Sequence, residues 1–171
     1  MHAVGFSLGA AVIGLALRQQ HDLTSVVYLS PASRPKESMW PRYEALWSQV
    51  KAHGVVEKPG SDVRLGRPIL ESLRDTDLGP RAFDLEVPLL VCHGTADARV
   101  DYTHTEKLLA RLDGKRETFR HIKFPGASHS FRPADTCWDR LADNLAEWFD
   151  EATLTSTLSR AHDGESQSLE T

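Results

Sequence analysis

The sequence predicts an α/β protein with a parallel sheet and helices on both of its faces, and three observations support this fold class. Strand-like and helix-like segments alternate along most of the 171 residues. Two strand-like segments, 25–29 and 87–92, are almost continuously apolar, as expected of strands that are buried on both faces. The third observation is the pentapeptide GFSLG at residues 5–9, which joins a short strand-like run to a helix.

The first predicted strand and helix surround Ser7. Residues 2–4 are strand-like, and residues 10–17 are small and apolar, which predicts a helix. A serine on a sharp turn between such elements exposes its hydroxyl, and Gly5 and Gly9 let the backbone close without a Cβ clash. Two glycines and a serine at this spacing arise by chance in roughly one chain of this length in twenty. Because the pattern can arise by chance, a simpler alternative stays open: a glycine-rich turn in which Ser7 caps the helix.

The segment between the strand at 25–29 and the strand at 87–92 is too long for a single crossover helix, which needs about a dozen residues. Residues 34–86 contain most of the prolines and a stripe of apolar side chains at helical spacing, namely Trp40, Tyr43, Leu46 and Trp47. We therefore expect a short helical cap inserted over the sheet. The stripe either packs this cap onto the body of the protein or lines a pocket for an acyl or aryl group.

The remaining elements follow the same alternation. Residues 102–112 predict an amphipathic helix, and residues 119–124 alternate as a half-exposed strand does. Residues 135–149 place apolar side chains on one face and predict the last helix. Residues 153–171 are rich in serine, threonine and glutamate, which predicts a disordered tail.

The composition is that of an ordinary globular domain, with 40% apolar residues, 26% charged residues and a net charge of −4. The lack of a basic stripe argues against a nucleic acid or an anionic membrane as a partner. No apolar run approaches the roughly 18 residues of a membrane span, and no secretion signal is visible, so we expect a cytoplasmic protein. Cys92 and Cys137 do not form a C-x-x-C pair and are expected to be reduced thiols, and we infer no metal and no cofactor.

Two further motifs each follow a predicted strand. One is HGTADARV at residues 93–100, and the other is GASHSF at residues 126–131. Ser7, Asp97 and His129 thus each stand at the carboxyl end of a predicted strand, where open parallel sheets gather their active-site groups. An imidazole can accept the proton of a serine hydroxyl, and a carboxylate can hold that imidazole in the productive tautomer.

These motifs together resemble the α/β-hydrolase family over about residues 2–150. The resemblance implies the α/β-hydrolase fold, with Ser7 as the nucleophile on the elbow, Asp97 as the acid and His129 as the catalytic histidine, in the chain order of the family. It also implies that the backbone N–H of Leu8 is one oxyanion-hole donor. His93 begins the acid motif, and we expect it to support the acid loop rather than to take part in the reaction. Simpler alternatives remain: Asp97 could be a turn residue and His129 a loop histidine. Asp101 is the alternative candidate for the acid.

The family's sheet has further strands before the elbow, so residues 1–152 are expected to be the C-terminal portion of such a domain, with the cap at about 34–86. In the family, those earlier strands carry the loop that donates the other oxyanion amide. The elbow strand is then a bare edge, through which the chain could pair with a second copy. Three explanations would account for a sequence that starts at the elbow strand. It is a fragment or a mis-started reading frame of a full hydrolase, it pairs with another chain, or it is a degenerate remnant.

The function predicted from these residues is that of a serine hydrolase, most simply a carboxylesterase that acts on a small-molecule ester or acyl substrate without a cofactor. Peptidase, thioesterase and lipase activities stay open, because the acyl pocket cannot be read from one sequence. The length and pattern of the cap resemble those of the esterase and acylaminopeptidase-type branches of the family. The alternative from another class is a non-catalytic binding module, which the short start favours and the intact set of Ser7, Asp97 and His129 opposes.

Overall fold

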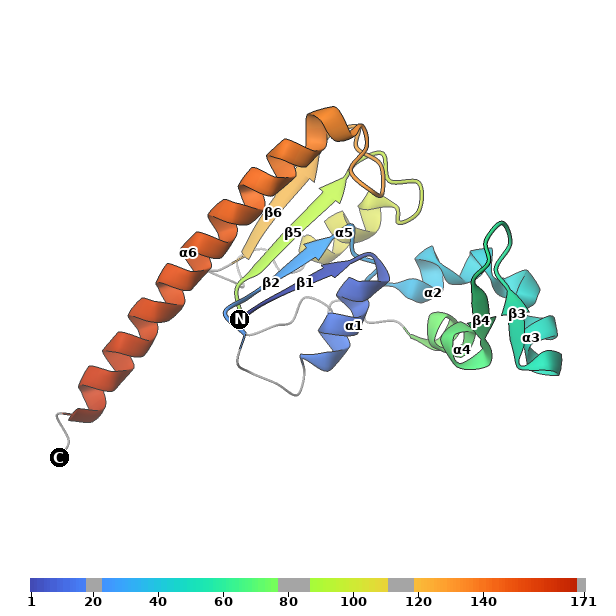
Figure 1. Cartoon of the computed structure of the whole chain (residues 1–171), viewed down its shortest axis with the longest axis horizontal. Helices are drawn as coiled ribbons and strands as arrows, with labels where there is room; N and C mark the ends of the chain where they lie inside the picture. Colours follow the sequence, from blue (N-terminus) through green and yellow to red (C-terminus); the bar gives the residue numbers. More distant parts are fainter. Residues whose placement is uncertain (18–22, 77–86, 111–118, 169–171) are drawn as a thin grey trace.

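The computed structural model describes residues 1–17, 23–76, 87–110 and 119–168. In this part of the chain, four parallel strands form the main sheet in the order β1-β2-β5-β6 (Figure 1). Their bounds are β1 His2–Phe6, β2 Ser25–Leu29, β5 Leu89–Gly94 and β6 Phe119–Phe124. The predicted α/β class is confirmed, and each of the four strands lies where the sequence predicts one.

The core lies on the two faces of the central strands β2 and β5. On one face, α1 (Leu8–Ala16) and α5 (Tyr102–Leu109) belong to a cluster that includes Val26, Tyr28, Leu89 and Val91. On the other face, α6 (Ala134–Ser168) packs through Leu141 and Trp148 against Val27, Leu90 and Cys92. Burial on both faces explains why these two strands are almost continuously apolar in sequence.

The inserted segment is described as far as Thr76, and the rest of the predicted cap lies outside the described residues. It contains α2 (Pro35–Ser38), the short 3₁₀ turns Trp40–Arg42 and Glu44–Leu46, α3 (Trp47–His53), β3 (Val55–Glu57), β4 (Arg64–Gly66) and α4 (Arg67–Asp75). The antiparallel hairpin of β3 and β4 is an addition to the helical cap that the sequence predicts. The stripe of Trp40, Tyr43, Leu46 and Trp47 packs against the buried residues Val50, Leu70 and Leu73, which favours the packing role over a pocket.

The last helix is longer than the sequence predicts. The structure continues α6 to Ser168, where a disordered tail was expected from residue 153 onward, and the helix projects beyond the sheet in Figure 1. Three of the polar side chains that suggest disorder instead bond to the helix itself. The hydroxyls of Thr153, Thr155 and Thr157 each donate to the carbonyl four residues earlier, at 2.7–3.0 Å.

Strand β1 is an edge of the described sheet and pairs only with β2 there. Val4 and Phe6 on this strand are 50% and 47% exposed, and Val12 and Leu15 on the neighbouring helix α1 are exposed as well. The bare apolar edge that the sequence predicts is therefore present in the described part of the chain. Among the described helices, none combines the length and the apolarity that a membrane crossing requires.

Candidate active site

Ser7 lies on the sharp turn between β1 and α1, in a backbone conformation that non-glycine residues seldom adopt. Its φ is 54° and its ψ is −118°. Neighbouring segments hold the turn, because the Ser7 N–H donates to the Leu29 carbonyl at 2.9 Å and the Ser7 carbonyl accepts from the Ala32 N–H at 3.0 Å. The Ser7 side chain makes no capping bond to α1, so the N-cap alternative does not describe its hydroxyl.

The two glycines of the pentapeptide differ in what the structure requires of them. A Cβ at Gly5 would lie 2.7 Å from the Cα and the backbone N of Ala10, so only glycine fits between β1 and the start of α1. A Cβ at Gly9 would meet no described atom within 4 Å. The expected clash is therefore found at the first glycine and not at the second.

Asp97 lies in the turn that follows β5, and its carboxylate accepts four hydrogen bonds. Oδ1 accepts from the backbone N–H groups of Arg99 at 2.8 Å and Val100 at 2.9 Å. Oδ2 accepts from His129 Nδ1 at 2.7 Å and from His93 Nε2 at 3.0 Å. Burial alone would raise the pKa of Asp97, but the bonds from His129, His93 and the two backbone groups outweigh it and hold this pKa well below its usual range. Asp97 is therefore an anion at neutral pH.

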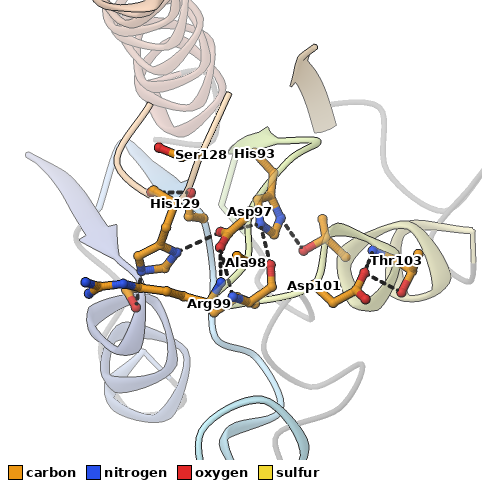
Figure 2. A network of polar contacts seen from close by, with 12 residues as sticks. His93, Asp97, Ala98, Arg99, Asp101, Thr103, Ser128 and His129 are labelled. Carbon is orange, nitrogen blue, oxygen red and sulfur yellow. Dashed lines mark hydrogen bonds and ion pairs between the residues drawn. The ribbon is translucent and has the colours of Figure 1, made fainter. Parts of the chain in front are cut away.

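His129 joins the other two residues. It lies in the loop after β6, and its Nε2 is 2.9 Å from the Oγ of Ser7 while its Nδ1 bonds to Asp97. Figure 2 shows its ring beside the Asp97 carboxylate, with His93 on the far side of that carboxylate. The structure thus brings together Ser7, Asp97 and His129 from three separate loops.

Asp101, the alternative acid, lies elsewhere. Its Oδ1 accepts hydrogen bonds from the backbone N–H and the hydroxyl of Thr103, at 2.8 and 2.7 Å, at the start of α5. This is the geometry of a helix cap. The acid that contacts His129 is Asp97.

Backbone contacts hold the acid loop and the histidine loop against each other. The Ala96 N–H donates to the Ala127 carbonyl at 3.0 Å, and the Thr95 N–H donates to the Phe124 carbonyl at 3.0 Å. A Cβ at Gly94 would lie 2.3 Å from the Ala127 carbonyl oxygen, so glycine is needed for the two loops to approach this closely.

The sequence does not reveal two residues that support the site. Ser30, at the end of β2, is buried and has a φ of 45°, and its hydroxyl donates to the His129 carbonyl at 3.0 Å. Thr105, buried in α5, is bonded to His93. The position of Ser30 directly after a buried strand could have marked it as a residue near the site, whereas nothing in the sequence distinguishes Thr105. Within the described residues, no group of three or more metal-binding side chains is placed to hold a metal ion.

A parallel sheet that carries a serine on a strand-to-helix turn, with a carboxylate and an imidazole after later strands, defines the α/β-hydrolase class. The chain belongs to the prolyl oligopeptidase family, whose sequence model matches residues 1–155. This match confirms the resemblance drawn from the motifs. No curated protein matches the chain in sequence.

Solved α/β-hydrolase structures share the fold. The esterase domain of a Rhodothermus marinus protein has a TM-score of 0.53 and 17% identity, over 78% of this chain and 54% of that chain. Est1E from Butyrivibrio proteoclasticus has a TM-score of 0.64 and 18% identity, over 88% and 60%. The monoacylglycerol lipase of Paleococcus ferrophilus has a TM-score of 0.60 and 19% identity, over 88% and 68%. The chain thus spans 54% and 60% of the first two proteins, and at these identities the likeness establishes the fold alone.

Proposed function

We propose that this protein is a serine hydrolase of the carboxylesterase type, in which Ser7 is the nucleophile, His129 the general base and Asp97 the orienting acid. The observation that carries the proposal is the continuous set of hydrogen bonds from the Ser7 hydroxyl through the His129 ring to the Asp97 carboxylate. An exposed serine hydroxyl is a weak nucleophile until a base beside it accepts its proton, and this arrangement provides that base.

The proton positions follow from the acceptors. Because the ionised Asp97 can only accept, His129 carries its proton on Nδ1, and the lone pair on Nε2 faces the Ser7 hydroxyl. When Ser7 Oγ forms a bond to the ester carbonyl carbon, its proton moves to His129 Nε2, and Asp97 stabilises the resulting imidazolium. The bond to the alkoxy group then breaks, His129 returns the proton to the departing alcohol, and an acyl-enzyme remains. Water attacks the acyl-enzyme by the same route and releases the acid.

The backbone N–H of Leu8 is the proposed oxyanion donor. Leu8 is the first residue of α1, where backbone N–H groups have no acceptor within the helix and the helix dipole favours negative charge. The positive φ of Ser7 turns the chain into this helix directly after the nucleophile. One such donor contributes about 100- to 1,000-fold to the rate in serine hydrolases. No second donor is assigned to the described residues.

A peptidase is the second candidate, and the match to the prolyl oligopeptidase family favours it. Esters and amides pass through the same acyl-enzyme, so the triad geometry does not separate them. Esters have the better leaving group and need less protonation by His129, which makes esterase activity the chemically less demanding of the two. Hydrolysis of p-nitrophenyl esters compared with peptidyl p-nitroanilides separates the two candidates.

A fluorophosphonate probe, which reacts covalently with activated serines, tests the proposed chemistry. We expect the wild-type chain to be labelled at Ser7 and Ser7→Ala to be unlabelled. Ser130→Ala is the matched control, because Ser130 is an exposed serine beside His129 and should leave the labelling intact. A folded wild-type chain that the probe does not label would refute the hydrolase and favour the non-catalytic binding module.

A further inference from the structure

His93 lies directly behind the acid and is completely buried. It comes from β5, four residues before Asp97, and its two ring nitrogens have different partners. Nε2 is 3.0 Å from Asp97 Oδ2 and 3.2 Å from the Val100 carbonyl oxygen. Nδ1 is 2.9 Å from the hydroxyl oxygen of Thr105 on α5. In Figure 2 the ring stands on the opposite side of Asp97 from His129.

These partners determine which nitrogen of His93 carries the proton. Both groups that face Nε2, a carboxylate and a carbonyl, can only accept, so Nε2 must be the donor. In the neutral ring Nδ1 is then an acceptor, and a hydroxyl is a group that can donate to it. The Thr105 hydroxyl therefore stabilises the one tautomer of His93 whose N–H points at Asp97.

We propose that His93, locked in its Nε2–H tautomer by Thr105, is a positioning residue that fixes the orientation of Asp97 for the reaction. This inference rests on the proposed function, because it assigns His93 a role through Asp97. Oδ2 receives one N–H from His129 and one from His93, and two backbone N–H groups hold Oδ1. The carboxylate plane is thus held before any substrate arrives.

The lock also connects the acid to the core of the fold. The bonds to Oδ1 come from the turn itself and move with it, whereas His93 belongs to β5 and Thr105 to α5. Both side chains are fully buried, so no water competes for these bonds. Removing the Thr105 hydroxyl leaves Nδ1 without its donor and weakens the preference for the Nε2–H tautomer, which the two acceptors at Nε2 still favour. A His93 ring with its proton on Nδ1 would present a lone pair to the Asp97 carboxylate and repel it.

Thr105→Val tests the lock, because valine has nearly the shape of threonine and removes only the hydroxyl. Thr105→Ser, which keeps the hydroxyl, is the matched control. The ring nitrogens of His93 are observed by ¹⁵N NMR in the full chain at neutral pH, and the rate of Ser7 labelling by the fluorophosphonate probe is measured in the same samples. We expect wild type and Thr105→Ser to show a single Nε2–H tautomer. Thr105→Val should show a shifted Nδ1 resonance and a measurable Nδ1–H fraction, because only the acceptors at Nε2 then favour the first tautomer. Labelling of Thr105→Val should slow by about 2- to 10-fold, the range for losing a hydrogen bond between neutral groups, and Thr105→Ser should restore it.

The measurements distinguish a failure of the inference about His93 from a failure of the proposed hydrolase function. A wild-type His93 that carries its proton on Nδ1 overturns the inference without any variant. Unchanged tautomer and labelling in Thr105→Val also overturn it, while the labelled Ser7 still supports the hydrolase. A wild type that shows the Nε2–H tautomer but no labelling refutes the hydrolase, and the His93 spectrum of Thr105→Val then still decides on the lock. A structural role alone would lower the melting temperature of Thr105→Val without changing the tautomer.

Discussion

Replacing Gly94 with alanine should separate the acid from the histidine. An added Cβ would lie 2.3 Å from the Ala127 carbonyl oxygen and 2.8 Å from the Ser128 carbonyl oxygen, whereas real Cβ atoms essentially never come within 3.0 Å. The obstacles are backbone atoms, so no side-chain rotation relieves the contact. The histidine loop must therefore move by at least 0.7 Å, the difference between 3.0 and 2.3 Å.

That movement is large compared with the tolerance of the site. Ala127 precedes His129 by two residues, and a 0.7 Å shift along the bond from His129 Nδ1 to Asp97 would lengthen it from 2.7 to 3.4 Å. Hydrogen bonds of this kind end at about 3.2 Å. Misplacement by about 1 Å can reduce a catalysed rate about 100-fold, so we expect Ser7 labelling in Gly94→Ala to slow by about that factor. Overpacking also costs about 1–3 kcal/mol of unfolding free energy, or roughly 2–12 °C in melting temperature.

The labelling rate and a thermal melt followed by circular dichroism measure both effects. Gly66→Ala in the cap is the matched control, since its Cβ would make only an ordinary contact, 3.6 Å from Pro68, and its φ of −80° suits alanine. It should change neither quantity appreciably. A Gly94→Ala chain that is labelled at the wild-type rate and melts at the wild-type temperature would refute the reasoning.

Three further predictions concern other parts of the molecule. Burial raises the pKa of the Cys92 thiol to about 12, so iodoacetamide at pH 8 should modify Cys92 only after unfolding in urea, as peptide mass spectrometry would show. Burial lowers the pKa of His121 to about 4, below its unfolded value of 6.5, so the folded chain binds fewer protons. The unfolding free energy should therefore be at its full value above pH 6.5 and fall towards pH 4, with a smaller slope in His121→Gln, measured by urea titrations at several pH values; an unchanged slope would contradict this. The exposed edge at β1 predicts self-association that rises with concentration, and Val4→Lys should reduce it in light scattering, because a charge on an edge strand opposes pairing. A wild type that stays monomeric at high concentration would count against that edge as an interface.

The parts of the fold that sequence predicts well are those that burial dictates. Strands β2 and β5 lie between two layers of helices, and their apolar runs make them visible without any other information. The hairpin of β3 and β4 escapes prediction because each strand has three residues, too few to show an alternating pattern. The helical residues after 152 escape prediction because composition alone does not distinguish a polar helix from a disordered segment. In the structure, three threonines of this segment bond along the helix.

The candidate site divides in the same way. Ser7, Asp97 and His129 can be picked out because each follows a strand, and parallel strands end at one edge of a sheet. The bonds that orient them join residues far apart in the chain, such as Ser30 and His129, and no local pattern records such a pairing. Thr105 is one of several threonines in ordinary surroundings, and only the packing of α5 against β5 brings it to His93.

Three residues around the site share one backbone feature with a consequence for engineering. Ser7, Ser30 and Phe131 have φ values of 54°, 45° and 55°, a region that costs non-glycine residues about 1–3 kcal/mol each. Glycine would relax each of them, so a search for heat-resistant variants should be drawn to these positions first. At Ser7 such a variant would lose its hydroxyl, and at Ser30 it would lose the support beneath His129. Selection for thermal stability would therefore favour glycine at Ser7 and Ser30, whereas selection for turnover would keep the two serines.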